Sequence, residues 1–164
     1  MERLWAPWRM EYIKAPKKMG ECIFCTKPRD KDDEKNLILM RGKLAFVIMN
    51  LYPYNPGHLM VAPYRHVGEF EKMREGELLE VLRYVRRSMN VLKEVMNPHG
   101  FNIGVNQGKI AGAGIVDHVH IHVVPRWSGD TNFMPVIFDT KVVVEEINRT
   151  YAKLRDQLTS KIKK

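Results

Sequence analysis

Cysteine is scarce in this chain, and long apolar runs are missing from it. Only two cysteines occur in 164 residues, both within Cys22-Ile23-Phe24-Cys25, so there is no disulfide framework and a reducing cytoplasm is the expected compartment. No apolar run approaches the roughly twenty residues of a membrane span, and the N-terminus lacks a signal-peptide apolar region. Internal repeats, low-complexity tracts and linkers are not visible either, which predicts a single domain over residues 1–164.

Positive charge is in excess. The net charge of +8 suits an anionic substrate and could also attract nucleic acid. Part of this charge belongs to the tail Lys161-Ile162-Lys163-Lys164 and to solvated helix faces, so nucleic acid is not expected as the principal partner. A membrane partner is not expected. The hydrophobic content of 45% is sufficient for a core in a chain of this length.

The order of the expected elements indicates an α+β fold. Short strands are predicted at residues 37–40, 44–49, 58–62, 101–106 and 118–124. A long helix precedes the fourth strand, because apolar residues recur at steps of four and three: Leu78, Leu82, Val85, Met89, Leu92 and Met96. This stripe should face the core, and Asn97-Pro98-His99-Gly100 should end the helix. We expect an antiparallel sheet of about five strands with the long helix packed on it.

The flanking segments are less regular. Residues 1–21 should form an N-terminal arm, because Pro7 and Pro16 interrupt any helix there. Residues 26–36 are charged and should form a surface loop. A further strand pair is expected around residues 136–144. Residues 144–164 should then form a C-terminal helix with a basic tail, whose apolar face carries Ile147, Tyr151, Leu154 and Leu158.

Three of the six histidines lie at strict period two in His118-Val119-His120-Ile121-His122. In a β-strand this spacing places the three imidazoles on one face and the aliphatic side chains on the other. Two chemistries fit such a row. The imidazoles could bind a transition metal together, or one could be a nucleophile while its neighbours handle protons and phosphate charge. The small-residue loop Asn106–Gly114 favours the second, because its backbone N–H groups can approach an anion.

The segment His118–Val124 resembles the His-φ-His-φ-His-φ-φ motif of the histidine triad (HIT) family of nucleotide hydrolases and transferases. Asn50, His58 and His66, at intervals of eight residues, resemble the family's upstream half. The opening Trp5–Met10 and the segment after the triad are similar to the prokaryotic diadenosine tetraphosphate phosphorylase branch. Dinucleoside polyphosphate hydrolases are other members of the family.

The resemblance implies the roles of the catalytic residues. His120, the middle histidine, would attack an α-phosphorus and carry the nucleotide as a phosphoramidate. His122 and His58 would supply protons and hydrogen bonds to the phosphate charge.

The substrate site follows from the same resemblance. Asn50 occupies a position that contacts ribose hydroxyls, and Asn106 one that contacts phosphate. The residues at base- and phosphate-binding positions are Leu51, Ile23, Phe24, Gly112 and Gly114. Gly114 also replaces a glutamine of the hydrolase members, which favours the phosphorylase branch. Lys109 and Arg126 could add positive charge beside this loop, either for inorganic phosphate or for the polyphosphate of the substrate itself.

The Cys22-x-x-Cys25 pair could hold one edge of a tetrahedral zinc or consist of two reduced thiols. In similar HIT proteins, histidines at the His66 and His118 positions complete the set. The resemblance thus implies one structural zinc per chain, and no organic cofactor is expected.

The expected function is cleavage of adenosine polyphosphates such as diadenosine tetraphosphate, through an adenylyl-histidine on His120 with phosphate as acceptor. The alternatives are a water-dependent hydrolase of dinucleotides or nucleoside phosphoramidates, and a zinc-stapled nucleotide-binding module without turnover. Related proteins pair into homodimers, so a homodimer is implied as well.

Overall fold

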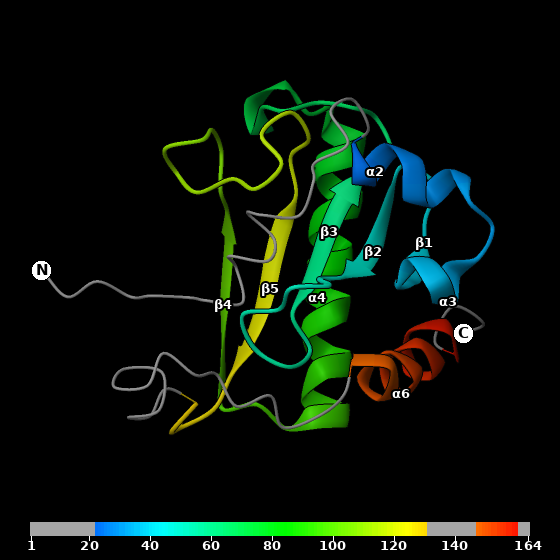
Figure 1. The fold of residues 1–164 in the computed structure, drawn as a ribbon, viewed down its shortest axis with the longest axis vertical. Helices are drawn as coiled ribbons and strands as arrows, with labels where there is room; N and C mark the ends of the chain where they lie inside the picture. The colour runs from blue at the N-terminus through cyan, green and yellow to red at the C-terminus, as the bar shows by residue number, and fades with distance from the viewer. Residues whose placement is uncertain (1–21, 131–146, 161–164) are drawn as a thin grey trace, which may run out of the picture.

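The computed structural model describes residues 22–130 and 147–160, and its centre is an antiparallel sheet (Figure 1). The five strands are β1 (Ile38–Arg41), β2 (Ala45–Met49), β3 (Leu59–Pro63), β4 (Gly100–Val105) and β5 (Ile121–Arg126). They lie in the order β1-β2-β3-β5-β4, and every neighbouring pair is antiparallel. The predicted α+β fold, with its sheet, long helix and C-terminal helix, is confirmed.

The helices lie around this sheet. They are α2 (Ile23–Thr26), η1 (Lys27–Arg29), α3 (Asp33–Asn36), η2 (Phe70–Lys72), α4 (Glu75–Met96) and α6 (Ile147–Ser160). The long helix α4 packs across one face of the sheet, against β2, β3 and β5, and α6 packs on α4 and β1 (Figure 1). The charged segment predicted as a loop over residues 26–36 in fact contains η1 and α3, because Asp32 caps α3 by accepting from the backbone N–H of Lys35 at 3.0 Å.

Helix α4 ends where the sequence indicated, since Asn97 adopts the left-handed conformation with a φ of 46° and closes the helix. The predicted apolar stripe was partly wrong. The side chain of Leu82 is 49% exposed, whereas Val81 and Val85 are buried. Glu77, one turn before Val81, is buried as well, because Arg65 donates to both of its carboxylate oxygens at 2.8 Å.

Helix α6 covers the edge of the core near β1. Leu154 and Leu158 are fully buried, and the Tyr151 hydroxyl donates to the carbonyl of Ile38 at 2.9 Å. This outcome agrees with the predicted apolar face of the C-terminal helix. The expected N-terminal arm, the strand pair near 136–144 and the basic tail lie outside the described residues. In residues 22–130 and 147–160, no helix combines the length and apolar composition needed to cross a bilayer.

One cross-strand row of side chains forms the floor of the site. Ile48 pairs with Met60, Met60 with His122, and His122 with Gly104. Directly paired residues point to the same face of a sheet. Ile48, Met60 and His122 line a pocket to which no residue of α4 contributes, so the row lies on the face opposite to α4. The row ends at Gly104, whose missing side chain leaves open space beside His122.

Candidate active site and metal cluster

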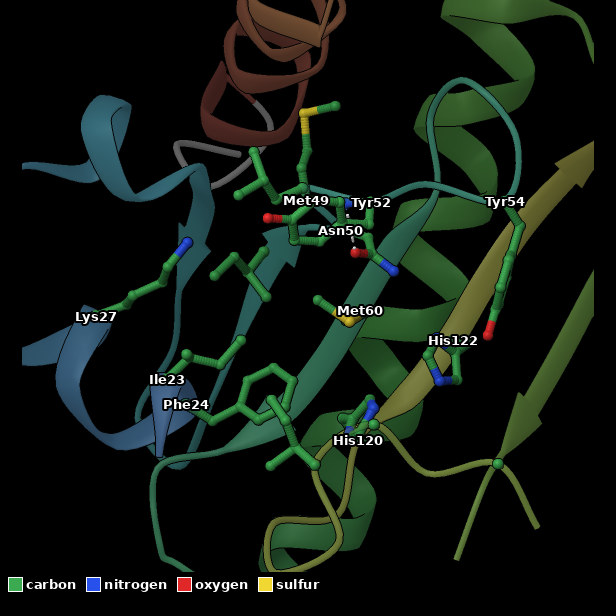
Figure 2. A pocket seen from close by; sticks show the side chains of 15 residues that line it. Ile23, Phe24, Lys27, Met49, Asn50, Tyr52, Tyr54, Met60, His120 and His122 are labelled. Atoms are coloured by element: carbon green, nitrogen blue, oxygen red, sulfur yellow. Dashed lines mark hydrogen bonds between the residues drawn. The ribbon is translucent and has the colours of Figure 1, made fainter. Parts of the chain in front are cut away.

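A pocket of about 180 Å³ lies between this row and the short helix α2 (Figure 2). His120 and His122 lie at one end of the pocket, and Lys27 lies on the opposite side (Figure 2). Six of the seven residues predicted to bind substrate line it: Ile23, Phe24, Asn50, Leu51, Gly112 and Gly114. The seventh, Asn106, does not line it; its Nδ2 lies 4.0 Å from the position that a Cβ on Gly112 would occupy.

His120 is oriented by its own backbone. Its Nδ1 lies 2.8 Å from the carbonyl oxygen of His118. A carbonyl can only accept, so Nδ1 carries the hydrogen and Nε2 keeps its lone pair. The ring is 5% exposed and packs on Phe24 at a centroid distance of 4.7 Å. Burial lowers the pKa of His120, so the neutral, nucleophilic form predominates at neutral pH.

A second chain of hydrogen bonds fixes His122. The backbone N–H of Tyr54 donates to His58 Nδ1 at 3.1 Å, so His58 carries its hydrogen on Nε2. That nitrogen lies 2.9 Å from His122 Nδ1 and donates to it. In neutral His122, therefore, the hydrogen is on Nε2. The rings of His120 and His122 meet edge to face with centroids 4.8 Å apart, so a ring that can donate lies beside the ring that carries the nucleophilic nitrogen.

His58 itself is fully buried and lies behind His122, so it does not line the pocket. Tyr54 stacks on His58 with ring centroids 4.8 Å apart and an interplanar angle of 18°. Asn50 Nδ2 lies 3.3 Å from His58 Nδ1, and its Oδ1 accepts from the backbone N–H of Tyr52 at 2.9 Å. The turn after β2 thus holds His58 from two sides, and Asn50 belongs both to the pocket wall and to this support.

The glycine loop borders the pocket through Gly112 and Gly114. Gly112 has a φ of 85°, which glycine adopts at little cost. Its N–H donates to the carbonyl of Lys109 at 3.1 Å, and the N–H of Ala113 donates to that of Gly108 at 3.3 Å. Two of the backbone donors that the sequence offered for an anion are therefore used within the loop.

Lys109 and Arg126, which the sequence suggested as cations beside the phosphates, do not line the pocket. Arg126 lies at the far end of β5 and holds Asp130 through two bonds of 2.6 and 2.8 Å. Asp130 also accepts from Asn55 Nδ2 at 2.8 Å. Because Asn55 belongs to the turn that carries Asn50 and Tyr54, this ion pair ties that turn to β5.

The two cysteines meet two histidines beside the pocket. The ligand atoms of Cys22, Cys25, His66 and His118 all lie within 4.8 Å of one another. Cys22 Sγ and Cys25 Sγ lie 3.2 and 3.5 Å from His118 Nδ1, and Cys25 Sγ lies 3.3 Å from His66 Nδ1. A tetrahedral zinc with bonds of about 2.3 Å to sulfur and 2.0 Å to nitrogen requires ligand separations of this size.

The second ring nitrogen of His118 is also consistent with a metal ligand. His118 Nε2 lies 2.8 Å from the carbonyl oxygen of Pro63, so the hydrogen is on Nε2 and the Nδ1 lone pair faces the sulfurs. Burial lowers the pKa of His118 to about 4, which keeps the ring neutral. Burial raises the pKa of the Cys22 thiol, so a thiolate there requires a neighbouring cation. The four residues therefore fit a closed structural zinc site.

The sequence interpretation missed several pocket residues. Lys27, Tyr54 and Met60 all line the pocket. Lys27 follows Phe24 by three residues and Ile23 by four, a spacing that places it on the same side of a continuing helix. Met60 pairs directly with His122, so knowledge of the register between β3 and β5 would have identified it as a neighbour of the histidine. No pattern in the sequence indicates the stacking of Tyr54 on His58.

Comparison with known proteins agrees with this geometry. The HIT domain model matches residues 31–129. A Mycobacterium tuberculosis protein named AP-4-A phosphorylase is 43% identical over 157 residues, covering 92% of this chain and 80% of that protein. An asymmetrical bis(5'-nucleosyl)-tetraphosphatase of Schizosaccharomyces pombe is 36% identical over 93 residues, covering 57% of this chain and 50% of that protein.

A zinc-bound histidine triad family protein of Mycobacterium smegmatis has the same fold. Its TM-score is 0.69 at 22% identity, covering 87% of this chain and 96% of that one. The matched motif, the fold and the sequence identity lead to one conclusion. The chain belongs to the HIT family.

Proposed function

We propose that this protein cleaves dinucleoside polyphosphates such as diadenosine tetraphosphate by transferring AMP to His120 and then to inorganic phosphate. The observation that carries the proposal is the bond from His120 Nδ1 to the His118 carbonyl, which leaves Nε2 as a lone-pair donor beside His122. The substrate class is supported by the relative named AP-4-A phosphorylase, which matches 92% of the chain at 43% identity.

In the first step, His120 Nε2 forms a bond to the α-phosphorus while the bond from that phosphorus to the bridging oxygen breaks. The leaving group of diadenosine tetraphosphate is then ATP. His122, supported from behind by His58, donates through Nε2–H to the departing oxygen. The positive charge that develops on the His120 ring is shared with the His118 carbonyl through Nδ1–H.

In the second step, a phosphate oxygen attacks the same phosphorus, the nitrogen–phosphorus bond breaks, and ADP leaves. If water attacks instead, the product is AMP. Asn50 would bind the ribose hydroxyls, while Ile23, Phe24 and Leu51 would enclose the base. Gly112 and Gly114 would lie beside the phosphates, and Asn106, whose Nδ2 lies close to Gly112, would contact a phosphate oxygen.

Water as the acceptor is the second candidate, and the tetraphosphatase relative supports it. Phosphorus NMR of the products with and without phosphate separates the two. We expect phosphate to accelerate cleavage and to give ADP with ATP. If AMP remains the product at saturating phosphate, the phosphorylase proposal is wrong and the hydrolase stands. A protein that binds nucleotide but never acquires label from substrate labelled at the α-phosphate would be a binding module instead.

We further propose that Cys22, Cys25, His66 and His118 hold one zinc per chain. The support is the donor geometry and the neutral, pre-oriented His118. All four positions would be filled by protein, so the ion would contribute folding energy and leave no open position for substrate. A homodimer and a cytoplasmic location stay predictions, as does the absence of an organic cofactor, a membrane partner and a nucleic-acid partner.

A further inference from the structure

Lys27 is a cation placed in a largely apolar pocket. It lines the same cavity as Phe24 and His120, and its side chain is half-buried. Its amino group donates to the carbonyl oxygen of Asn36 at 3.3 Å. Burial lowers the pKa of Lys27, and no carboxylate offsets that effect within residues 22–130 and 147–160. Burying an ammonium group without a counterion among the described residues is costly, so a ligand that supplies acceptors would stabilise it.

The donor inventory of lysine limits what this group can recognise. An ammonium has three hydrogens and no acceptor, and the carbonyl of Asn36 takes one of the hydrogens. The remaining two can bond only to acceptor atoms, which water supplies in the free pocket and a ligand supplies in the occupied one. A ligand amino group pointed at Lys27 would place donor against donor and would be disfavoured. The side chain thus distinguishes an oxygen from an amino group at the same position.

The layout of the pocket identifies the part of the ligand that meets Lys27. If the α-phosphorus lies at His120 and the ribose at Asn50, the base extends toward the side where Lys27 lies (Figure 2). A purine is attached to ribose through its five-membered ring, so its six-membered ring enters deepest. The edge formed by position 6 of that ring and by N7 of the five-membered ring would then reach Lys27.

We propose that Lys27 is a specificity-determining residue that donates to the O6 and N7 edge of a 6-oxopurine, so that the pocket takes hypoxanthine or guanine nucleotides at least as well as adenine nucleotides. The two acceptors of a 6-oxopurine lie side by side on this edge. Adenine offers N7 beside an amino donor, so it matches the ammonium less well. This inference rests on the proposed function, because that function sets the direction in which the nucleotide lies.

Inosine monophosphate and adenosine monophosphate are the probes, because their bases differ only at position 6 and in the hydrogen on the adjacent N1. Calorimetric titration of the full chain with each nucleotide measures the two dissociation constants. For the wild-type protein, we expect inosine monophosphate to bind as tightly as adenosine monophosphate or more tightly. Adenosine monophosphate binding more tightly by tenfold would overturn the inference without any variant.

The variant Lys27→Met keeps the length of the side chain and removes its charge. We expect it to weaken inosine monophosphate about tenfold, the cost of losing a bond to a charged donor, and to change adenosine monophosphate less than about threefold. Lys31→Met is the matched control, because Lys31 is exposed, carries the same charge and does not line the pocket. It should change neither constant. Lys27→Arg keeps a cationic donor and should retain the preference.

A purely structural role for Lys27 predicts a different pattern. If the lysine only fastened η1 to the carbonyl of Asn36, Lys27→Met would lower thermal stability and weaken both nucleotides by the same factor. Equal losses, or no loss, therefore overturn the inference while leaving the proposed function in place. If neither nucleotide binds to the wild-type protein, the proposed function fails, and the inference fails with it.

Discussion

Asp130 allows the strongest physical test of how the turn after β2 is held. Its carboxylate receives two bonds from Arg126 and one each from Asn55 Nδ2 and the backbone N–H of Trp127, the last at 3.2 Å. The side chain of Asp130 is 12% exposed and that of Arg126 is 42% exposed, so solvent screens the pair in part. These donors hold the pKa of Asp130 well below its usual range.

Asp130→Asn keeps the shape and removes the charge. The screened ion pair contributes about 1 kcal/mol. The new amide N–H₂ also faces donors from Arg126 or Asn55, which costs about another 1 kcal/mol. We expect the free energy of unfolding to fall by about 2 kcal/mol at pH 7, or about 4–8 °C in melting temperature for a chain of this size.

The difference between the two proteins should depend on pH. Because the pKa of Asp130 is lowered by folding, the unfolded state takes up the proton more readily, and acid favours unfolding of the wild-type protein. The stabilisation is fully present above the unfolded pKa, for which the ordinary value is 3.8, and is lost as the pH falls below it. Asparagine does not titrate. The gap between wild type and variant should therefore shrink between about pH 5 and pH 2.

Urea unfolding followed by tryptophan fluorescence at several pH values measures this gap. Asp156→Asn is the control, since Asp156 lies exposed on α6, and it should leave stability unchanged at every pH. A gap that keeps the same size from pH 7 to pH 3 would refute the reasoning, because it would show that the charge of Asp130 does not contribute.

Two further predictions concern the site. His120→Ala should abolish turnover and labelling by substrate while nucleotide binding persists, because it removes the attacking nitrogen and little of the pocket wall. A rate near that of the wild type would exclude His120 as the nucleophile. Protein prepared without chelator should contain about one zinc per chain. Cys22→Ser should lower the melting temperature clearly and should reduce the specific activity of the folded protein comparatively little. Elemental analysis without stoichiometric metal would contradict the second prediction.

The histidine spacing predicted the geometry of the site well, although the strand itself is shorter than expected. β5 begins at Ile121, so His118 and His120 precede its ladder. The backbone N–H of Val119 instead donates to the carbonyl of Val67 at 2.7 Å, and this bond keeps the segment extended. Period-two alternation therefore still places His120 beside His122. A strand assignment from sequence alone cannot distinguish a sheet ladder from an extended segment held by one neighbour.

The predicted stripe on α4 was wrong only at Leu82, because two registers fit the apolar residues at the start of the helix. Leu78 and Leu79, like Val81 and Leu82, are neighbours in the sequence, and hydropathy does not choose between them. The structure selects the register that buries Val81 and leaves Leu79 and Leu82 about half exposed. The same register buries Glu77, which pairs with Arg65, and a contact of this kind between two segments cannot be found from periodicity.

Charged pocket residues were the hardest to predict. From the sequence, Lys27 was predicted to lie in a surface loop, and Arg126 was predicted to lie beside the phosphates. In the structure, Lys27 lines the pocket and Arg126 does not. Arg126 instead donates to Asp130 and, at 2.6 Å, to Asn102 Oδ1. The destination of a long, flexible side chain depends on which acceptors the fold brings within reach. That information lies in tertiary contacts.

The short helix α2 has a thermodynamic consequence. Cys25 within it and Cys22 just before it belong to the Cys₂His₂ cluster, while Ile23 and Phe24 form a wall of the pocket. A four-residue helix has almost no stability of its own, so contacts on both sides determine its position. A metal bound by the cluster and a nucleotide bound in the pocket would then be linked ligands. If removing the metal lowers the affinity for nucleotide by some factor, bound nucleotide must raise the affinity for the metal by that same factor.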